Sequence, residues 1–171
     1  MTDETPPESS ALGVRIRALK ERIYATFTGL AIVVAIDVTG EGGAWSAFIM
    51  ILVGIVGISA AGFLAEVVAH QVGHRRLPSG AEVGEMARIA GSALGSASIP
   101  LVVIALSGFG LIALELALPI AMGVYALTLV GIFFVASRST GLRLIQRILT
   151  SAMLLALAAL VVGVLFLAHT H

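Results

Sequence analysis

The sequence predicts an all-α integral membrane protein, built as a bundle of five transmembrane helices. Three observations predict this class: the composition, the length of the apolar stretches and the one-sided placement of the basic residues. Of the 171 residues, 58% are hydrophobic and only 12% are charged, and the mean hydropathy is +1.07. A soluble domain of this length could not cover such a surface with polar groups, so the bilayer must be the solvent.

Two segments precede the apolar stretches. Residues 1–10 are acidic and contain proline and serine, a composition typical of a disordered tail. Residues 11–22 place Leu12 and Ile16 at helical spacing beside several basic residues, which indicates an interfacial amphipathic helix. Residues 23–171 then make up the five-span membrane domain.

Each apolar stretch approaches the roughly 20 residues that a helix needs to cross a ~30 Å hydrocarbon layer. The predicted spans cover residues 23–38, 47–74, 89–106, 111–137 and 145–168. The run Gly108-Phe109-Gly110 separates the third span from the fourth, which would otherwise form one impossibly long helix. Pro100 and Pro119 fall inside spans, where membrane helices tolerate kinks.

The basic residues predict the orientation. With five spans, all ten Lys and Arg residues fall on one side of the membrane, although the formal net charge is zero. The positive-inside rule then places the N-terminus in the cytoplasm and the C-terminus outside. We therefore expect a multi-pass protein of the cell (plasma) membrane, on the assumption of a prokaryotic source.

Composition and motifs also exclude several classes of function. The chain has no cysteine, so disulfides and thiolate metal sites are ruled out. Its few basic residues flank the membrane spans, which gives no support for nucleic-acid binding. Nothing resembles a nucleophile–base pair, a P-loop or a dinucleotide-binding turn, so we expect no enzymatic activity. The lipid bilayer is the one certain partner.

Small residues recur at helical spacing in two spans. The second span carries such a stripe at Gly57, Ala61, Ala65, Ala69 and Gly73, and the third span has Gly91 and Gly95. Small residues let helix backbones approach closely in lipid. The stripes are interpreted either as tight packing inside one bundle or as the seam of a homo-oligomer, with a dimer favoured.

The end of the second span, "AEVVAHQVGHRR", holds the main candidate site. Glu66, His70 and His74 lie four residues apart, so they share one helical face, which we expect to turn toward protein at the cytoplasmic boundary. A carboxylate at this depth needs a partner, which His70 could supply, with Arg75 or Arg88 contributing. Other ligands would have to come from the following connection.

Three interpretations of this face stay open. Imidazole and carboxylate groups suit a divalent metal ion such as Fe, Mn or Zn, with Glu82 and Glu85 as secondary ligands. Alternatively the same groups relay protons, because histidine changes charge near neutral pH. In the third interpretation they only form a polar helix end in the headgroup region. No cofactor is certain; a divalent metal ion is the candidate.

Glu115 is a further secondary candidate. It lies four residues before Pro119, and a proline at that distance leaves a backbone carbonyl near residue 115 without its helical hydrogen bond. Irregular backbone of this kind can line a cavity in a membrane protein.

The second half of the chain resembles the vacuolar iron transporter family. "GSALGSASIPLVVIAL" resembles that family's third span, and "ALTLVGIFFVASRSTGLRLIQRILTSAMLLALAALVVGV" resembles its fourth span, basic loop and fifth span. "SAAGFLAEVV" is similar to its second span, which would place Glu66 at that span's acid. The resemblance implies the five-span fold and proton-coupled export of a divalent cation.

The chain departs from that family in two places. The family's first span opens with an Asp-Gly pair, where this chain has Tyr24-Ala25, and its long metal-binding cytoplasmic helices are reduced here to "RRLPSGAEVGEMAR". From the resemblance, the expected function is a proton-coupled or divalent-cation transporter. The alternatives are a non-transporting accessory or structural membrane protein and a homo-oligomeric channel.

Overall fold

A computed structural model gives the structure of the chain and describes four long helices. The described residues are 7–40, 42–138, 145, 146, 148, 149, 152 and 156. The helices are α1 (Pro7–Thr39), α2 (Ala44–His74), α3 (Gly80–Gly108) and α4 (Leu114–Arg138). Each is long and apolar enough to cross a membrane, so the protein is an all-α, multi-pass membrane protein. The predicted fifth span, residues 145–168, lies largely outside the described residues.

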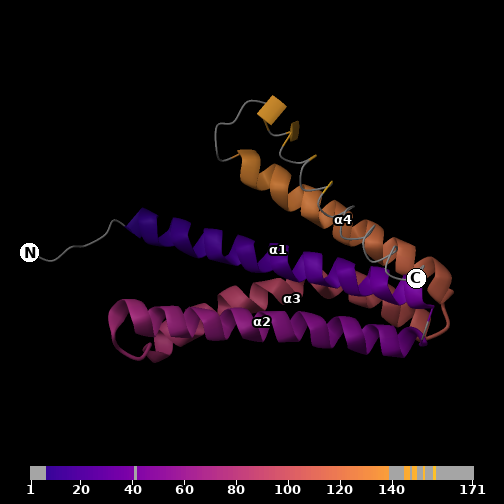
Figure 1. Cartoon of the computed structure of the whole chain (residues 1–171), viewed down its shortest axis with the longest axis horizontal. Coiled ribbons are helices and arrows are strands. Elements are labelled where there is room, and N and C mark those ends of the chain that lie inside the picture. Colours follow the sequence, from indigo (N-terminus) through magenta and orange to yellow (C-terminus); the bar gives the residue numbers. More distant parts are fainter. Residues whose placement is uncertain are drawn as a thin grey trace, which may run out of the picture.

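Three of the helices form a compact bundle. α1, α2 and α3 contact one another and run side by side, whereas α4 packs its first half on α1 and α3 and then diverges from them (Figure 1). The α2–α3 connection lies at the same end of the bundle as the beginning of α1, and we call this the basic end (Figure 1). The α1–α2 and α3–α4 connections lie at the opposite end.

α1 is one continuous helix where the sequence analysis expected three segments. Residues 7–10, assigned there to a disordered tail, belong to the helix, because proline is tolerated at the first position of a helix. The expected interfacial helix, residues 11–22, is simply the N-terminal part of α1. No proline interrupts the segment between Pro7 and Thr39, so nothing separates the basic stretch from the span that follows.

The remaining helix ends follow from local chemistry. α2 ends at His74, as predicted, and Arg75 adopts the left-handed conformation (φ 51°) while its N–H donates to the Gln71 carbonyl. α3 begins at Gly80, earlier than the predicted residue 89, because Ser79 and Glu82 form a reciprocal capping box.

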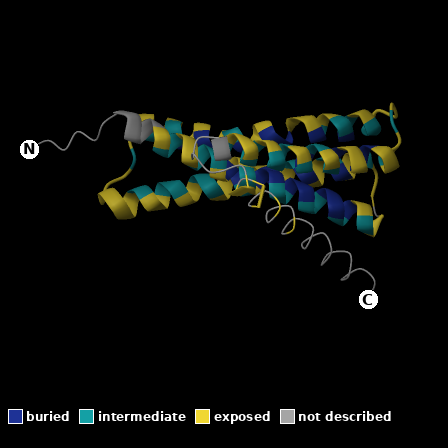
Figure 2. Ribbon diagram, turned by 90° about the horizontal axis from the view of Figure 1, so that it is seen from above, coloured by how far each residue is buried: buried dark blue, intermediate teal, exposed yellow. Residues whose placement is uncertain are grey.

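The interior is packed through glycines that accept side chains from neighbouring helices. A Cβ atom at Gly29 would lie 2.5 Å from the Tyr125 hydroxyl oxygen, and one at Gly108 would lie 2.8 Å from the Trp45 ring. Gly54 accepts Ile32 in the same way. Figure 2 shows that buried residues gather where the helices face one another. Close backbone approach with dispersion contacts therefore holds these helices together.

The two stripes of small residues lie elsewhere. Every member of both stripes is exposed: Gly57, Ala61, Ala65, Ala69, Gly73, Gly91 and Gly95. A Cβ added at any of the four glycines among them would meet nothing within 4 Å. The stripes therefore lie outside the contacts between the described helices, which other glycines make. The oligomer seam stays a prediction.

Gly29→Ala is expected to destabilise the bundle, because the new methyl group collides with the Tyr125 ring. Overpacking of this kind costs about 1–3 kcal/mol. Gly13→Ala is the matched control on the same helix, since nothing lies within 4 Å of its added Cβ. Thermal unfolding in detergent should therefore show a lower midpoint for Gly29→Ala only. Equal midpoints for the two variants would contradict this packing of α4 on α1.

Candidate functional site

A groove of about 630 Å³ opens between α1, α2 and α3 at the basic end. Apolar side chains of α1 and α3 make up part of its lining. Its ionisable lining residues are Arg17, His70, His74, Glu82 and Glu85. Both histidines and both glutamates were candidate residues in the sequence analysis. The fold therefore brings these four candidates to one groove.

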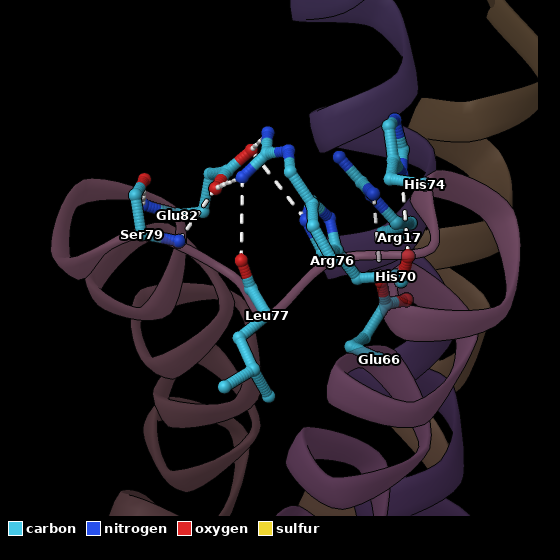
Figure 3. Close-up of polar contacts among 8 residues, drawn as sticks. All are labelled: Arg17, Glu66, His70, His74, Arg76, Leu77, Ser79 and Glu82. Carbon is cyan, nitrogen blue, oxygen red and sulfur yellow. Dashed lines mark hydrogen bonds and ion pairs between the residues drawn. The ribbon is translucent and has the colours of Figure 1, made fainter.

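The predicted face of α2 does turn toward protein. The side chains of Glu66 and His70 are 19% and 9% exposed, whereas His74 is exposed. The two imidazole rings stack, with centroids 4.4 Å apart and planes inclined by 18° (Figure 3). The stack holds the His70 ring against the groove wall.

Glu66 finds its partner on a different helix from the one expected. Arg17 of α1 places Nη1 3.4 Å from Glu66 Oε2 and Nη2 3.6 Å from Glu85 Oε1, so one guanidinium links all three helices. The expectation of His70, Arg75 or Arg88 as the partner of Glu66 is therefore wrong. The guanidinium arrives from α1 because that helix is continuous and crosses the level of Glu66.

A second ion pair closes the α2–α3 connection. Arg76 donates to both carboxylate oxygens of Glu82, over 2.6 and 2.9 Å, and Glu82 also accepts from the Ser79 N–H (Figure 3). Hydrogen bonding and the charge of Glu82 raise the pKa of Arg76 above its ordinary value. The pair therefore stays charged throughout the physiological range and fixes the Glu82 carboxylate beside the groove.

His70 faces this fixed carboxylate. Its Nε2 atom lies 3.7 Å from Glu82 Oε1, too far for a hydrogen bond, and is buried without a hydrogen-bond partner among the described residues. Protonation of the imidazole would turn this contact into an ion pair. His70 is therefore placed where the gain or loss of one proton changes the electrostatics of the groove.

The candidate metal ligands do not converge. Glu66 points to Arg17, His70 faces Glu82, and His74 places Nδ1 3.3 Å from the His70 carbonyl (Figure 3). Within the described part of the chain, no group of three or more His, Asp or Glu side chains could hold a metal ion. Glu115 is exposed in the first turn of α4, at the opposite end of the bundle.

Besides Arg17, the sequence analysis missed the ionisable residue Glu21. It lies on α1 one turn beyond Arg17, and only 5% of it is exposed. Its place in the basic run "RIRALKER" makes it look like a surface charge. The only local signal is its spacing of four from Arg17, which puts both residues on one face of α1.

Arg17 and Glu66 should be energetically coupled. A double-mutant cycle with Arg17→Gln and Glu66→Gln, followed by unfolding in detergent, is expected to give a coupling free energy of about 0.5–1 kcal/mol, because Arg17 is partly exposed. The control cycle combines Arg15→Gln with Glu66→Gln. Arg15 is exposed, so this cycle should give no coupling free energy. Equal coupling in the two cycles would contradict the pairing.

Comparison with known proteins adds no family to this description. No protein-family model, no curated protein and no solved structure matches the chain. The function is therefore argued from the groove and from the charged residues around it.

Proposed function

We propose that this membrane protein is a proton-coupled cation transporter whose groove exchanges protons with the cytoplasm. One observation carries the proposal: among the described residues the Nε2 atom of the nearly buried His70 has no hydrogen-bond partner, and it lies 3.7 Å from a fixed carboxylate in an open groove. Imidazole changes charge near neutral pH, which suits a proton relay. Arg17, which also lines the groove, pairs with Glu66, which extends the ionisable groups beyond the groove.

The proposed topology has five spans, with the N-terminus in the cytoplasm and the C-terminus outside. The placement of all ten Lys and Arg residues on one side supports it under the positive-inside rule. The groove then opens to the cytoplasm, in the plasma membrane of a prokaryotic cell. The resemblance to the vacuolar iron transporter family supports a cation as the coupled substrate.

Protons fit this groove better than a resident metal ion does. A guanidinium 3.4 Å from Glu66 competes with any cation for that carboxylate, and Arg76 occupies both oxygens of Glu82. A proton needs only one acceptor at a time, whereas a metal ion needs several converging ligands. The arrangement therefore favours a relay over a metal centre of Glu66, His70 and His74.

A non-transporting accessory role is the second candidate. The exposed small-residue stripes favour it, because they give two helices a flat outer face against which another transmembrane helix could pack. The same faces could join two copies of this chain into a dimer. A channel between such copies is the third class and would use the stripes as its seam.

The transport proposal is tested in liposomes that contain a pH-sensitive dye. An imposed pH gradient should dissipate faster with the protein than without it, and His70→Gln should slow this flux by at least about tenfold, in keeping with the usual contribution of a positioned acid–base group. Arg75→Gln is the control, because Arg75 is an exposed residue at the same end of the bundle and does not line the groove.

Addition of Mn²⁺ outside or inside the same liposomes tests cation coupling, since a coupled cation gradient should drive proton movement. Wild-type flux equal to that of empty liposomes would contradict transport and favour the accessory role. If His70→Gln leaves the proton flux unchanged, the proton relay does not use His70, and that part of the proposal is wrong.

A further inference from the structure

Two arginines of α1, Arg15 and Arg22, share a face of that helix with Gly29. The three residues are spaced by seven, which is close to two helical turns, so they lie nearly in line along α1. At Gly29 this face is covered by α4, because the Tyr125 ring fills the place of the missing side chain. Nearer the basic end α4 has diverged, and both arginines are exposed (Figure 1). The face that α4 covers at Gly29 is therefore an exposed, cationic face at the basic end.

A third cation lies beside this face on α3. The Ser92 hydroxyl oxygen lies 3.5 Å from the Ala18 carbonyl oxygen of α1, so the two helices adjoin at this level. Both helices begin at the basic end and run away from it (Figure 1). Arg88 lies one turn before Ser92 and is exposed, and Arg15 lies about one turn before Ala18. Arg88 is thus level with Arg15 on the neighbouring helix.

These three arginines have no counter-ion among the described side chains. None of them forms an ion pair there. The exposed and half-buried acids of the basic end are already engaged with other arginines: Glu66 and Glu85 with Arg17, and Glu82 with Arg76. The basic end therefore presents unpaired positive charge on this face.

Glu21 precedes Arg22 in the sequence but lies on a different face of α1. A Cβ atom at Gly62 of α2 would lie 2.7 Å from the Glu21 carboxyl carbon, so the carboxylate packs into the space beside that glycine. Adjacent residues of a helix point about 100° apart. The Glu21 carboxylate is directed at α2, whereas Arg22 is exposed on the face that α4 leaves.

The arginines lie where a bilayer presents its headgroups. Arg22 is the last charged residue before an apolar run that continues to Ile36, and Arg15 lies about 10 Å nearer the basic end. A guanidinium group at the edge of the hydrocarbon layer is costly without an anion beside it. The anion that a membrane supplies at this depth is the phosphate of a lipid headgroup, which arginine binds through paired N–H donors.

α4 supplies an apolar surface next to the cations. Residues 116–136 of α4 contain no charged side chain, so the helix gives the arginines no counter-ion. On the side of Tyr125, the positions one and two turns further along are Leu129 and Ile132, and both are only half-buried. A soluble anion would neutralise the arginines but leave this apolar surface uncovered. A phospholipid can do both, with its phosphate on α1 and its acyl chains along α4.

We propose that Arg15 and Arg22, with Arg88 beside them, bind the headgroup of an anionic phospholipid whose acyl chains pack against α4. The lipid replaces α4 as the partner of this face of α1 in the leaflet at the basic end. This binding site is separate from the groove and does not rest on the proposed transport function.

Native mass spectrometry of the protein in detergent tests the site, with phosphatidylglycerol and phosphatidylcholine of the same acyl chains as probes. The wild-type protein should retain phosphatidylglycerol at lower lipid concentrations than phosphatidylcholine. Arg15→Gln together with Arg22→Gln should lower the affinity for phosphatidylglycerol by about tenfold or more, in keeping with the usual contribution of two basic residues. Arg15→Lys with Arg22→Lys keeps both charges and should retain most of the affinity.

The matched control removes two other exposed cations of the basic end, by Lys20→Gln with Arg75→Gln. Lys20 lies on the opposite side of α1, where its Nζ atom is 5.6 Å from the centre of the Tyr24 ring. This control should leave the affinity for phosphatidylglycerol nearly unchanged. An equal loss in the control would show diffuse attraction by net charge and overturn the proposed site.

Three further results would also overturn the proposal. The first is a wild-type protein with no preference for phosphatidylglycerol over phosphatidylcholine. The second is an equal loss of affinity in the double lysine and double glutamine variants. The third is displacement of the lipid by glycerol 3-phosphate at the same concentration, because that compound carries the phosphate without acyl chains and would assign the arginines to a soluble anion.

Discussion

The antiparallel pairing of α1 with α2 is the constraint on which the rest of the bundle depends. In lipid, the hydrophobic effect does not favour one register of two apolar helices over another, because the lipid tails are as apolar as the side chains. Two contacts one turn apart supply that preference here: the ion pair of Arg17 with Glu66, and the packing of the Glu21 carboxylate against Gly62. A slip by one turn in one direction would leave Arg17 opposite Gly62 and Glu66 without its cation. A slip by one turn in the other direction would bring two carboxylates, Glu21 and Glu66, level with each other.

The same pairing positions the groove. Because Arg17 also reaches Glu85, the register of α1 on α2 fixes where the beginning of α3 can lie. Ser79 and Glu82 then start α3 early enough to bring Glu82 beside His70. One connected arrangement thus contains His70, Glu82 and Arg17. A substitution of Arg17 should therefore alter the structure of the whole basic end.

Sequence patterns predicted features that neighbouring residues determine and missed contacts between residues far apart in the chain. The α2 end at His74, the break at Gly108-Phe109-Gly110 and the shared face of Glu66 and His70 are local features of helical spacing and turn chemistry, and the structure confirms them. The early start of α3 was also readable, because Ser79 and Glu82 have capping-box spacing. The Arg17–Glu66 pair joins residues 49 positions apart, and closer cations along the chain looked equally suitable.

The glycines show the same limit of prediction from sequence. Gly29 and Gly62 are no more prominent in the sequence than Gly57 or Gly91, yet the first two accept Tyr125 and Glu21 while the others face outward. Spacing tells which glycines share a face, but only the shape of the neighbouring helix decides which face is inside. Glu21 escaped notice for a related reason, since its carboxylate packs into the space beside Gly62, which is remote in the sequence.

Disulfide cross-linking between α1 and α2 measures this register directly. The chain has no cysteine of its own, so the paired replacements Glu21→Cys and Gly62→Cys introduce the only two thiols. Mild oxidation in native membranes should link them, whereas Glu21→Cys with Leu64→Cys should not link within one chain, because Leu64 is 61% exposed on the outer face. Efficient linkage of the Leu64 pair, with none of the Gly62 pair, would contradict the register and the buried position of Glu21.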